Sequence, residues 1–202
     1  MEAMKHVLTG KNYVPAATLR IKDKDYFHLK NLYIMLHDWT IEEGFAPAGK
    51  DEDFPETFHM HRETQKSGTE MWIWWRLSKG TGNSYYLYEI DLDFHVILLK
   101  DAEVMHQGKK FKTNWGEIEL KLWARVMFDK EGKWQKSPLL KHMDKIWHQR
   151  LFEKEAYAHR VTLYRYSYRL IEAVKTYLKL RTYLPEPELE RWPNEFGLGE
   201  VQ

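Results

Sequence analysis

Hydrophobic and polar residues alternate through two long stretches in the middle of the chain, 84–99 and 116–129. Every second residue is apolar from Tyr86 to Val96 and from Ile118 to Phe128, and most of the residues between are charged or histidine. A period of two places the apolar side chains on one face of a strand and the charged ones on the other. The pattern therefore predicts an antiparallel sheet with one buried face and one polar face.

Turn residues divide this part of the chain into five predicted strands. The predicted segments are 56–64, 70–78, 84–99, 102–113 and 116–129. Residues typical of turns separate them, at 66–68, 79–83 and 114–116, and a further turn is expected within the fourth segment at 107–108. We expect 84–99 to be the central strand, because its alternation is long and unbroken.

A helix is predicted ahead of these strands, from Asp23 or Asp25 to about Glu43. Either aspartate can cap its first turn, and Gly44 supplies the stop. Its apolar residues recur at steps of three and four, which places them on one helix face: Leu29, Leu32, Tyr33, Leu36 and Trp39. Residues 5–21 are expected to be extended.

A long helical region is predicted over 138–184. No Gly or Pro interrupts 139–184, and apolar residues recur there at helical spacing. Ser137 is suited to cap this helix, and Pro185 ends it. The region is one long helix or two helices with a break near 159–162.

Together these elements predict an α+β fold with a single domain over 1–184. An antiparallel β-sheet of about five to six strands is packed by an N-terminal helix and a long C-terminal helical region. An acidic, proline-containing C-terminal tail follows at 185–202. The order of elements resembles the helix-grip arrangement, in which an antiparallel sheet wraps a long C-terminal helix around an apolar cavity.

Composition narrows the function classes. The 202 residues include no cysteine, which excludes disulfides, thiolate metal sites and cysteine nucleophiles. No apolar run reaches the roughly 18 residues of a membrane span, so we expect a cytoplasmic protein without a membrane span. Many charged residues and few amides favour a heat-adapted source. The 9 tryptophans and 12 tyrosines indicate a thick aromatic core, an interface, or both.

The net charge of +1 hides a marked asymmetry along the chain. Lys and Arg outnumber Asp and Glu by 11 to 4 over 136–183, whereas 38–56 and 184–202 are acidic. A basic helix with interleaved tyrosines can bind nucleic acid, an anionic membrane surface or an acidic protein surface. Alternatively, it is a solvated face balanced by acidic segments of the same or a neighbouring chain. The near-neutral net charge of the whole chain favours such a charge-balanced helix face over nucleic-acid binding.

Several polar residues could carry chemistry on the predicted strands. Histidines and aspartates at alternate positions are weak candidates for a divalent metal site: His59, His61, Asp91, Asp93 and His95. The alternative is a solvated strand face, and we expect no essential metal and no cofactor. Glu89 with its two aspartate neighbours could serve acid–base chemistry, although such a row is typical of an exposed face. A further alternative is that basic groups of another element or subunit cover these acids. No nucleotide-binding loop, nucleophile elbow or HExxH motif is present.

The segment 71–75 is apolar on both faces of a predicted strand. Trp72 and Trp74 are expected to share the polar side with His59 and Asp91, where they would form an interface or stack on a ligand. Simple packing under another part of the chain is the alternative.

The favoured hypothesis is a non-enzymatic structural or interaction protein that self-associates as a homo-oligomer through aromatic and charged surfaces. No catalytic residue is assigned, and the predicted interface residues are Trp72, Trp74, Trp147, Tyr164, Tyr168, Arg165 and Arg169. The alternative is a small-molecule-binding protein or enzyme with a helix-grip-like apolar cavity, lined by Trp75, Tyr86, Tyr88, Phe94, Tyr164 and Tyr168. A third hypothesis is a nucleic-acid-associated protein using the basic C-terminal helix.

Overall fold

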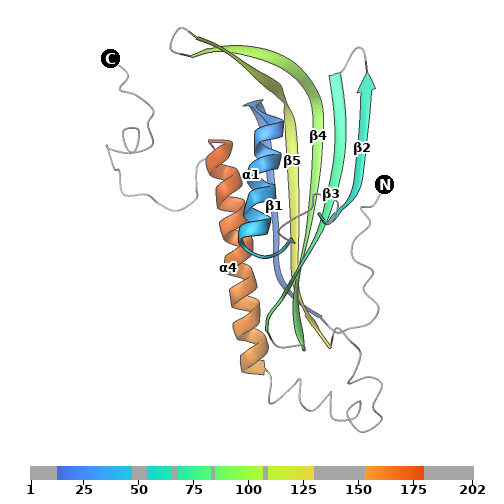
Figure 1. Cartoon of the computed structure of the whole chain (residues 1–202), viewed down its shortest axis with the longest axis vertical. Helices are drawn as coiled ribbons and strands as arrows, with labels where there is room; N and C mark the ends of the chain where they lie inside the picture. The colour runs from blue at the N-terminus through green and yellow to red at the C-terminus, as the bar shows by residue number, and fades with distance from the viewer. Residues whose placement is uncertain are drawn as a thin grey trace, which may run out of the picture.

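The computed structural model places five strands in one sheet and both described helices on the same side of it (Figure 1). It describes residues 13–46, 54–64, 68–82, 85–106, 109–129 and 153–179. The elements in chain order are β1 (Tyr13–Phe27), α1 (Leu29–Glu42), β2 (Glu56–Thr64), β3 (Gly68–Gly80), β4 (Tyr86–His106), β5 (Lys109–Phe128) and α4 (Glu153–Tyr177). This confirms the α+β fold with an antiparallel sheet.

The strands lie in the order β1-β5-β4-β3-β2, and every neighbouring pair is antiparallel. β4 is the central strand, as its alternation predicted. The first strand lies beside the last one, and α4 packs along β1 and β5 on the helix-covered face (Figure 1). Of the predicted helical region 138–184, only 153–179 falls within the described residues, and the tail 185–202 lies outside them. No described helix is both long and apolar enough to cross a membrane.

The first helix begins later than the sequence predicted. Asp23 pairs with Ile118, and Phe27 with Asn114, so β1 continues through the residues expected to start the helix. His28 is the cap, and its Nδ1 accepts the Asn31 N–H at 3.3 Å. Pairing along β5 therefore overrides the local capping preference of the aspartates.

The predicted strand break near 100 and the turn at 114–116 are both wrong. β4 passes through this region in one piece, with a bulge where Leu98 adopts a φ of 58°. Gly116 lies within β5 opposite this bulge, and a Cβ there would meet the Ile97 carbonyl oxygen and the Leu99 Cα, both at 3.1 Å. Glycine at 116 thus allows the bulged strand to approach closely.

The core fills the space between the sheet and the two helices. The alternating apolar residues of β4 and β5 point into it, and each helix contributes one leucine-rich face. The completely buried apolar residues of the helices are Leu32 and Leu36 of α1 and Leu163, Leu170 and Val174 of α4. Burial of this aromatic and aliphatic surface provides most of the driving force for the fold.

Lys79 of β3 joins the two helices at one end. Its Nζ donates to the Glu43 carbonyl oxygen at 2.6 Å and to the Tyr166 hydroxyl at 3.0 Å. The same ammonium lies 4.4 Å from the centre of the Tyr166 ring, and Arg169 pairs with the Glu43 carboxylate at 2.9 Å. The ammonium also suits the negative end of the α1 dipole. These contacts hold α1 beside α4.

Candidate functional site

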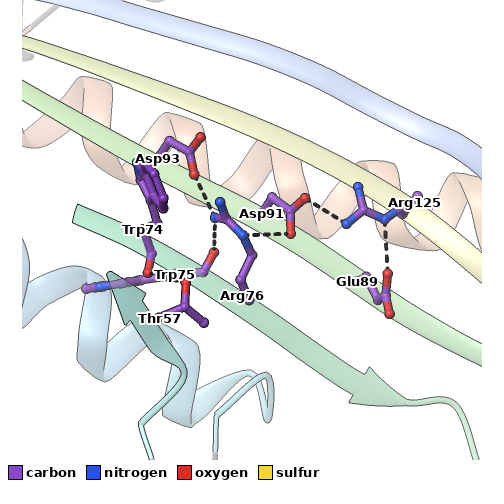
Figure 2. Close-up of polar contacts among 8 residues, drawn as sticks. All are labelled: Thr57, Trp74, Trp75, Arg76, Glu89, Asp91, Asp93 and Arg125. Carbon is purple, nitrogen blue, oxygen red and sulfur yellow. Dashed lines mark hydrogen bonds and ion pairs between the residues drawn. The ribbon is translucent and has the colours of Figure 1, made fainter. Parts of the chain in front are cut away.

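Five charged side chains form a connected ion network on the sheet face opposite the helices (Figure 2). Glu89, Asp91 and Asp93 project from β4, with Arg76 on β3 and Arg125 on β5 beside them. Arg76 Nη1 donates to Asp93 at 2.6 Å, and its Nε lies 3.6 Å from Asp91. Arg125 donates from Nη2 to Asp91 at 2.7 Å and from Nε to Glu89 at 3.0 Å. Asp91 therefore lies between two guanidinium groups.

The network is buried, although no described helix covers this face. Asp91 is 0% exposed, and the other four side chains are buried as well. Desolvation raises the pKa of Asp93, and the hydrogen bond from Arg76 partly opposes that rise. A buried carboxylate keeps its charge only with such partners. The prediction of a solvated acidic face is therefore wrong at the centre of β4.

The chemistry open to this network is limited by its pairing. All three carboxylates accept hydrogen bonds or form ion pairs with arginine, and Arg76 also donates to the Trp75 carbonyl oxygen at 2.9 Å. A general acid or base needs an oxygen directed at a reacting group, with a pKa matched to its task. The paired groups of the network are therefore better suited to holding β3, β4 and β5 in register than to transferring a proton.

The structure places the candidate metal ligands on two different faces. His59 pairs with Ile73, whose side chain lies in the core, so His59 and His61 are on the helix side of β2. His95 is on the opposite side, together with the aspartates of the ion network. Two of these histidines contact a glutamate: His59 at 3.2 Å from Glu56 and His95 at 3.0 Å from Glu70. Within the described part of the chain, no three or more His, Asp or Glu side chains are grouped to hold a metal ion.

Trp72 and Trp74 lie on the helix-free face with the ion network, although not with His59. Trp72 stacks on His95 with ring centres 5.0 Å apart, and Trp74 stacks on Phe58 at 4.1 Å. Both tryptophans are thus packed against neighbours on the sheet. Trp147, the third predicted tryptophan anchor, is outside the described residues.

The six residues proposed to line a cavity do not share one space. Trp75, Tyr86, Tyr88 and Phe94 are buried in the core, where the Trp75 and Phe94 rings lie 4.9 Å apart. The other two candidates are on the outward side of α4 and are described below.

His159 was missed by the sequence analysis. It comes from α4 and lies against Tyr86 and Tyr88, the two core tyrosines at the N-terminal end of β4. Its Nδ1 is 2.8 Å from the Tyr88 hydroxyl, and its ring centre is 4.2 Å from that of Tyr86. Burial lowers the pKa of His159, whereas burial and the Glu155 carboxylate raise the pKa of Tyr86 to about 12. Only the packing of α4 on β4 brings these groups together.

Arg76 was also missed, although a signal for it existed. It follows Trp72 and Trp74 at the same period of two, so the pattern already placed it on their face of the strand.

The outward side of α4 carries a row of aromatic and basic side chains that are exposed or, for Tyr168, half-buried. We call this row the tyrosine face: Tyr157, Tyr164, Arg165, Tyr168 and Arg169. Tyr157 is 64% exposed and Tyr164 is 45% exposed. The rings of Tyr164 and Tyr168 stack with centres 5.9 Å apart. Next to them is a surface groove of about 460 Å³. Its lining is formed by Thr162, Tyr164, Arg165, Tyr166, Tyr168 and Arg169.

Comparison with known proteins adds no further assignment, because the chain matches no known protein family and no curated protein. The two candidate sites differ in their geometry. The tyrosine face offers exposed apolar area with positive charge, whereas the ion network consists of groups that are already paired.

Proposed function

We propose that this protein is a non-enzymatic interaction protein that self-associates through the tyrosine face of α4. The observation that carries the proposal is the second apolar row on this helix. One side of α4 is committed to the core through Leu163, Leu170 and Val174, while the opposite side exposes tyrosines at helical spacing. Exposed aromatic rows of this kind are typical of protein–protein contact sites.

The chemistry of the tyrosine face supports a protein partner. Tyrosine and arginine are among the residue types that contribute most to binding energy at interfaces, and a tyrosine ring buries large area at low entropic cost. The stacked pair Tyr164 and Tyr168 is already ordered, which lowers the entropy lost on binding.

The two other hypotheses have less support. A ligand cavity would need space among Trp75, Tyr86, Tyr88 and Phe94, which instead lie in the core cluster. A nucleic-acid site would need a continuous positive surface. Here Glu43 pairs with Arg169, and Asp38 and Glu42 lie on the neighbouring helix.

Sedimentation of the full chain over the micromolar range tests the proposal. The wild type should form a complex larger than one chain, and removal of both stacked rings in Tyr164→Ala/Tyr168→Ala should raise the dissociation constant at least about tenfold. Salt should weaken the complex without abolishing it, because exposed ion pairs contribute only about 0–1 kcal/mol each.

The control is Tyr26→Ala, which removes a tyrosine that is 56% exposed on β1. Tyr26 pairs with Trp115 on the sheet edge, away from the helix layer. Its loss should leave the complex unchanged. A wild-type chain that stays monomeric at low salt would refute self-association.

A further inference from the structure

The helix α1, which lies next to α4 on the same side of the sheet (Figure 1), carries a second groove on its surface. We call it the acidic groove, and its volume is about 450 Å³. Its lining residues are Asn31, Ile34, Met35, Asp38, Trp39 and Glu42. Among the described residues, this lining has two carboxylates and no basic group, whereas the groove on α4 has two arginines and no carboxylate.

We infer that the partner of the tyrosine face is the acidic groove of a second copy of this chain, in a closed two-fold dimer. This inference rests on the proposed self-association and specifies its geometry. The contact in such a dimer is isologous, so each copy contributes both grooves.

The arrangement of the two helices carries this inference. Lys79, Tyr166 and the Arg169–Glu43 pair hold α1 and α4 side by side, so the two grooves have a fixed separation. A two-fold axis parallel to the helix layer and running between the helices places α1 of one copy opposite α4 of the other. The same operation places the second pair of grooves together, so both contacts form at once.

Charge and apolar area both match in this arrangement. Arg165 of one copy meets a groove that holds Asp38, whose side chain is 63% exposed, and Glu42. Tyr164 and Tyr168 meet Ile34, which is 44% exposed, and its neighbour Trp39. Opposite potentials steer the encounter, and the aromatic and aliphatic contacts provide most of the affinity. A nucleic acid would gain from Arg165 but would be repelled by the adjacent carboxylates.

A charge exchange between the two grooves tests the geometry. Asp38→Arg and Arg165→Glu should each raise the dissociation constant at least about tenfold, since every closed dimer contains the altered contact twice. An equimolar mixture of the two variants should recover most of the lost affinity. In the mixed dimer, one contact is native and the other joins the two substituted positions, whose charges are opposite again. Arg62→Glu, on the exposed part of β2, is the matched charge control and should not change the affinity.

The outcomes separate this inference from the proposed function. A mass that stops at two chains, together with rescue in the mixture, supports the closed dimer. A complex that tolerates Asp38→Arg but is lost in Tyr164→Ala/Tyr168→Ala overturns the acidic groove as partner and leaves self-association intact. A mass that keeps growing with concentration overturns the two-fold arrangement in favour of head-to-tail contact. A monomeric wild type whose salt-dependent binding to RNA or DNA is lost in Arg165→Glu overturns both proposals.

Discussion

The two faces of β4 are both buried at the centre of the sheet, but different interactions stabilise them. On the helix side, Ile90, Leu92 and Phe94 pack against the two helices in a continuous apolar core. On the opposite side, Asp91 is just as inaccessible to water, yet its neighbours are Arg76 and Arg125. One strand thus combines non-directional apolar packing with a network that depends on the positions of individual atoms.

This difference has consequences for tolerance to change. Apolar contacts can readjust when one side chain is replaced by another of similar size. A buried ion network cannot, because the loss of one partner leaves the others charged and unpaired. The ion network joins β3, β4 and β5 through side chains that meet only in the observed register, so it favours that register over one shifted by a residue.

The largest expected effect is on the helix side. Ile90→Asp introduces a charge at a position with no exposed area between Leu77 and Ala124, so the chain should fail to fold cooperatively. Circular dichroism during thermal unfolding measures this. Ile90→Val is the matched control, with an expected loss of about 1 kcal/mol. A soluble Ile90→Asp variant with a cooperative transition would show that the two faces are assigned the wrong way round.

An intermediate effect is expected from the ion network. Asp91→Asn keeps the shape of the side chain but removes the charge between two buried guanidinium groups, so unfolding free energy should fall by about 3 kcal/mol. Urea denaturation at neutral pH gives the value. Lys22→Gln is the control at the rim of the same face, where the half-exposed Lys22 pairs with Glu117 at 2.6 Å, and it should cost no more than about 1 kcal/mol. Equal losses of unfolding free energy for Asp91→Asn and Lys22→Gln would show that the buried ion network contributes no more to stability than an ion pair at the rim.

The smallest effect is the dependence of unfolding free energy on pH that arises from Tyr86, the buried first residue of β4. The pKa of Tyr86 is raised from 10.0 to about 12, so the folded chain keeps the proton where the unfolded chain releases it. The stability that depends on this proton is complete below about pH 10 and is lost as the pH rises towards 12. Urea denaturation between pH 9 and 11 should therefore show a smaller loss for Tyr86→Phe than for the wild type. The exposed Tyr26→Phe should follow the wild type, and a Tyr86→Phe curve parallel to that of the wild type would contradict the assignment.

Much of the layout could be predicted from local patterns. The alternation of β4 and β5 correctly assigned which side chains share a face, and the helical spacing of Leu32 and Leu36 correctly marked the core side of α1. The boundaries were less predictable. Asp23 and Asp25 prefer to cap a helix, but pairing with β5 keeps them in β1, and Gly116 is typical of a turn but faces the Leu98 bulge instead.

The candidate sites divide in the same way. Tyr164, Tyr168, Arg165 and Arg169 were predicted as interface residues from composition and helical spacing, although the same spacing also made the two tyrosines candidates for a cavity lining. The period of two indicated the strand face of Arg76. The pairing of Asp91 with Arg125 and the contact of His159 with Tyr88 could not be predicted, since each joins residues far apart in the chain.

The sequence by itself determined the class of fold, the central strand and the core-facing side of β4, β5 and α1. These depend on the period of two or 3.6 residues, which is a local property of the backbone. Only the tertiary structure decided that the polar side of β4 is buried, that His59 and His95 lie on opposite faces, and that the neighbouring helices α1 and α4 carry one groove lined by acidic and one lined by basic residues. Burial and ion pairing depend on which strands and helices become neighbours, and that choice is made by the packing of the whole chain.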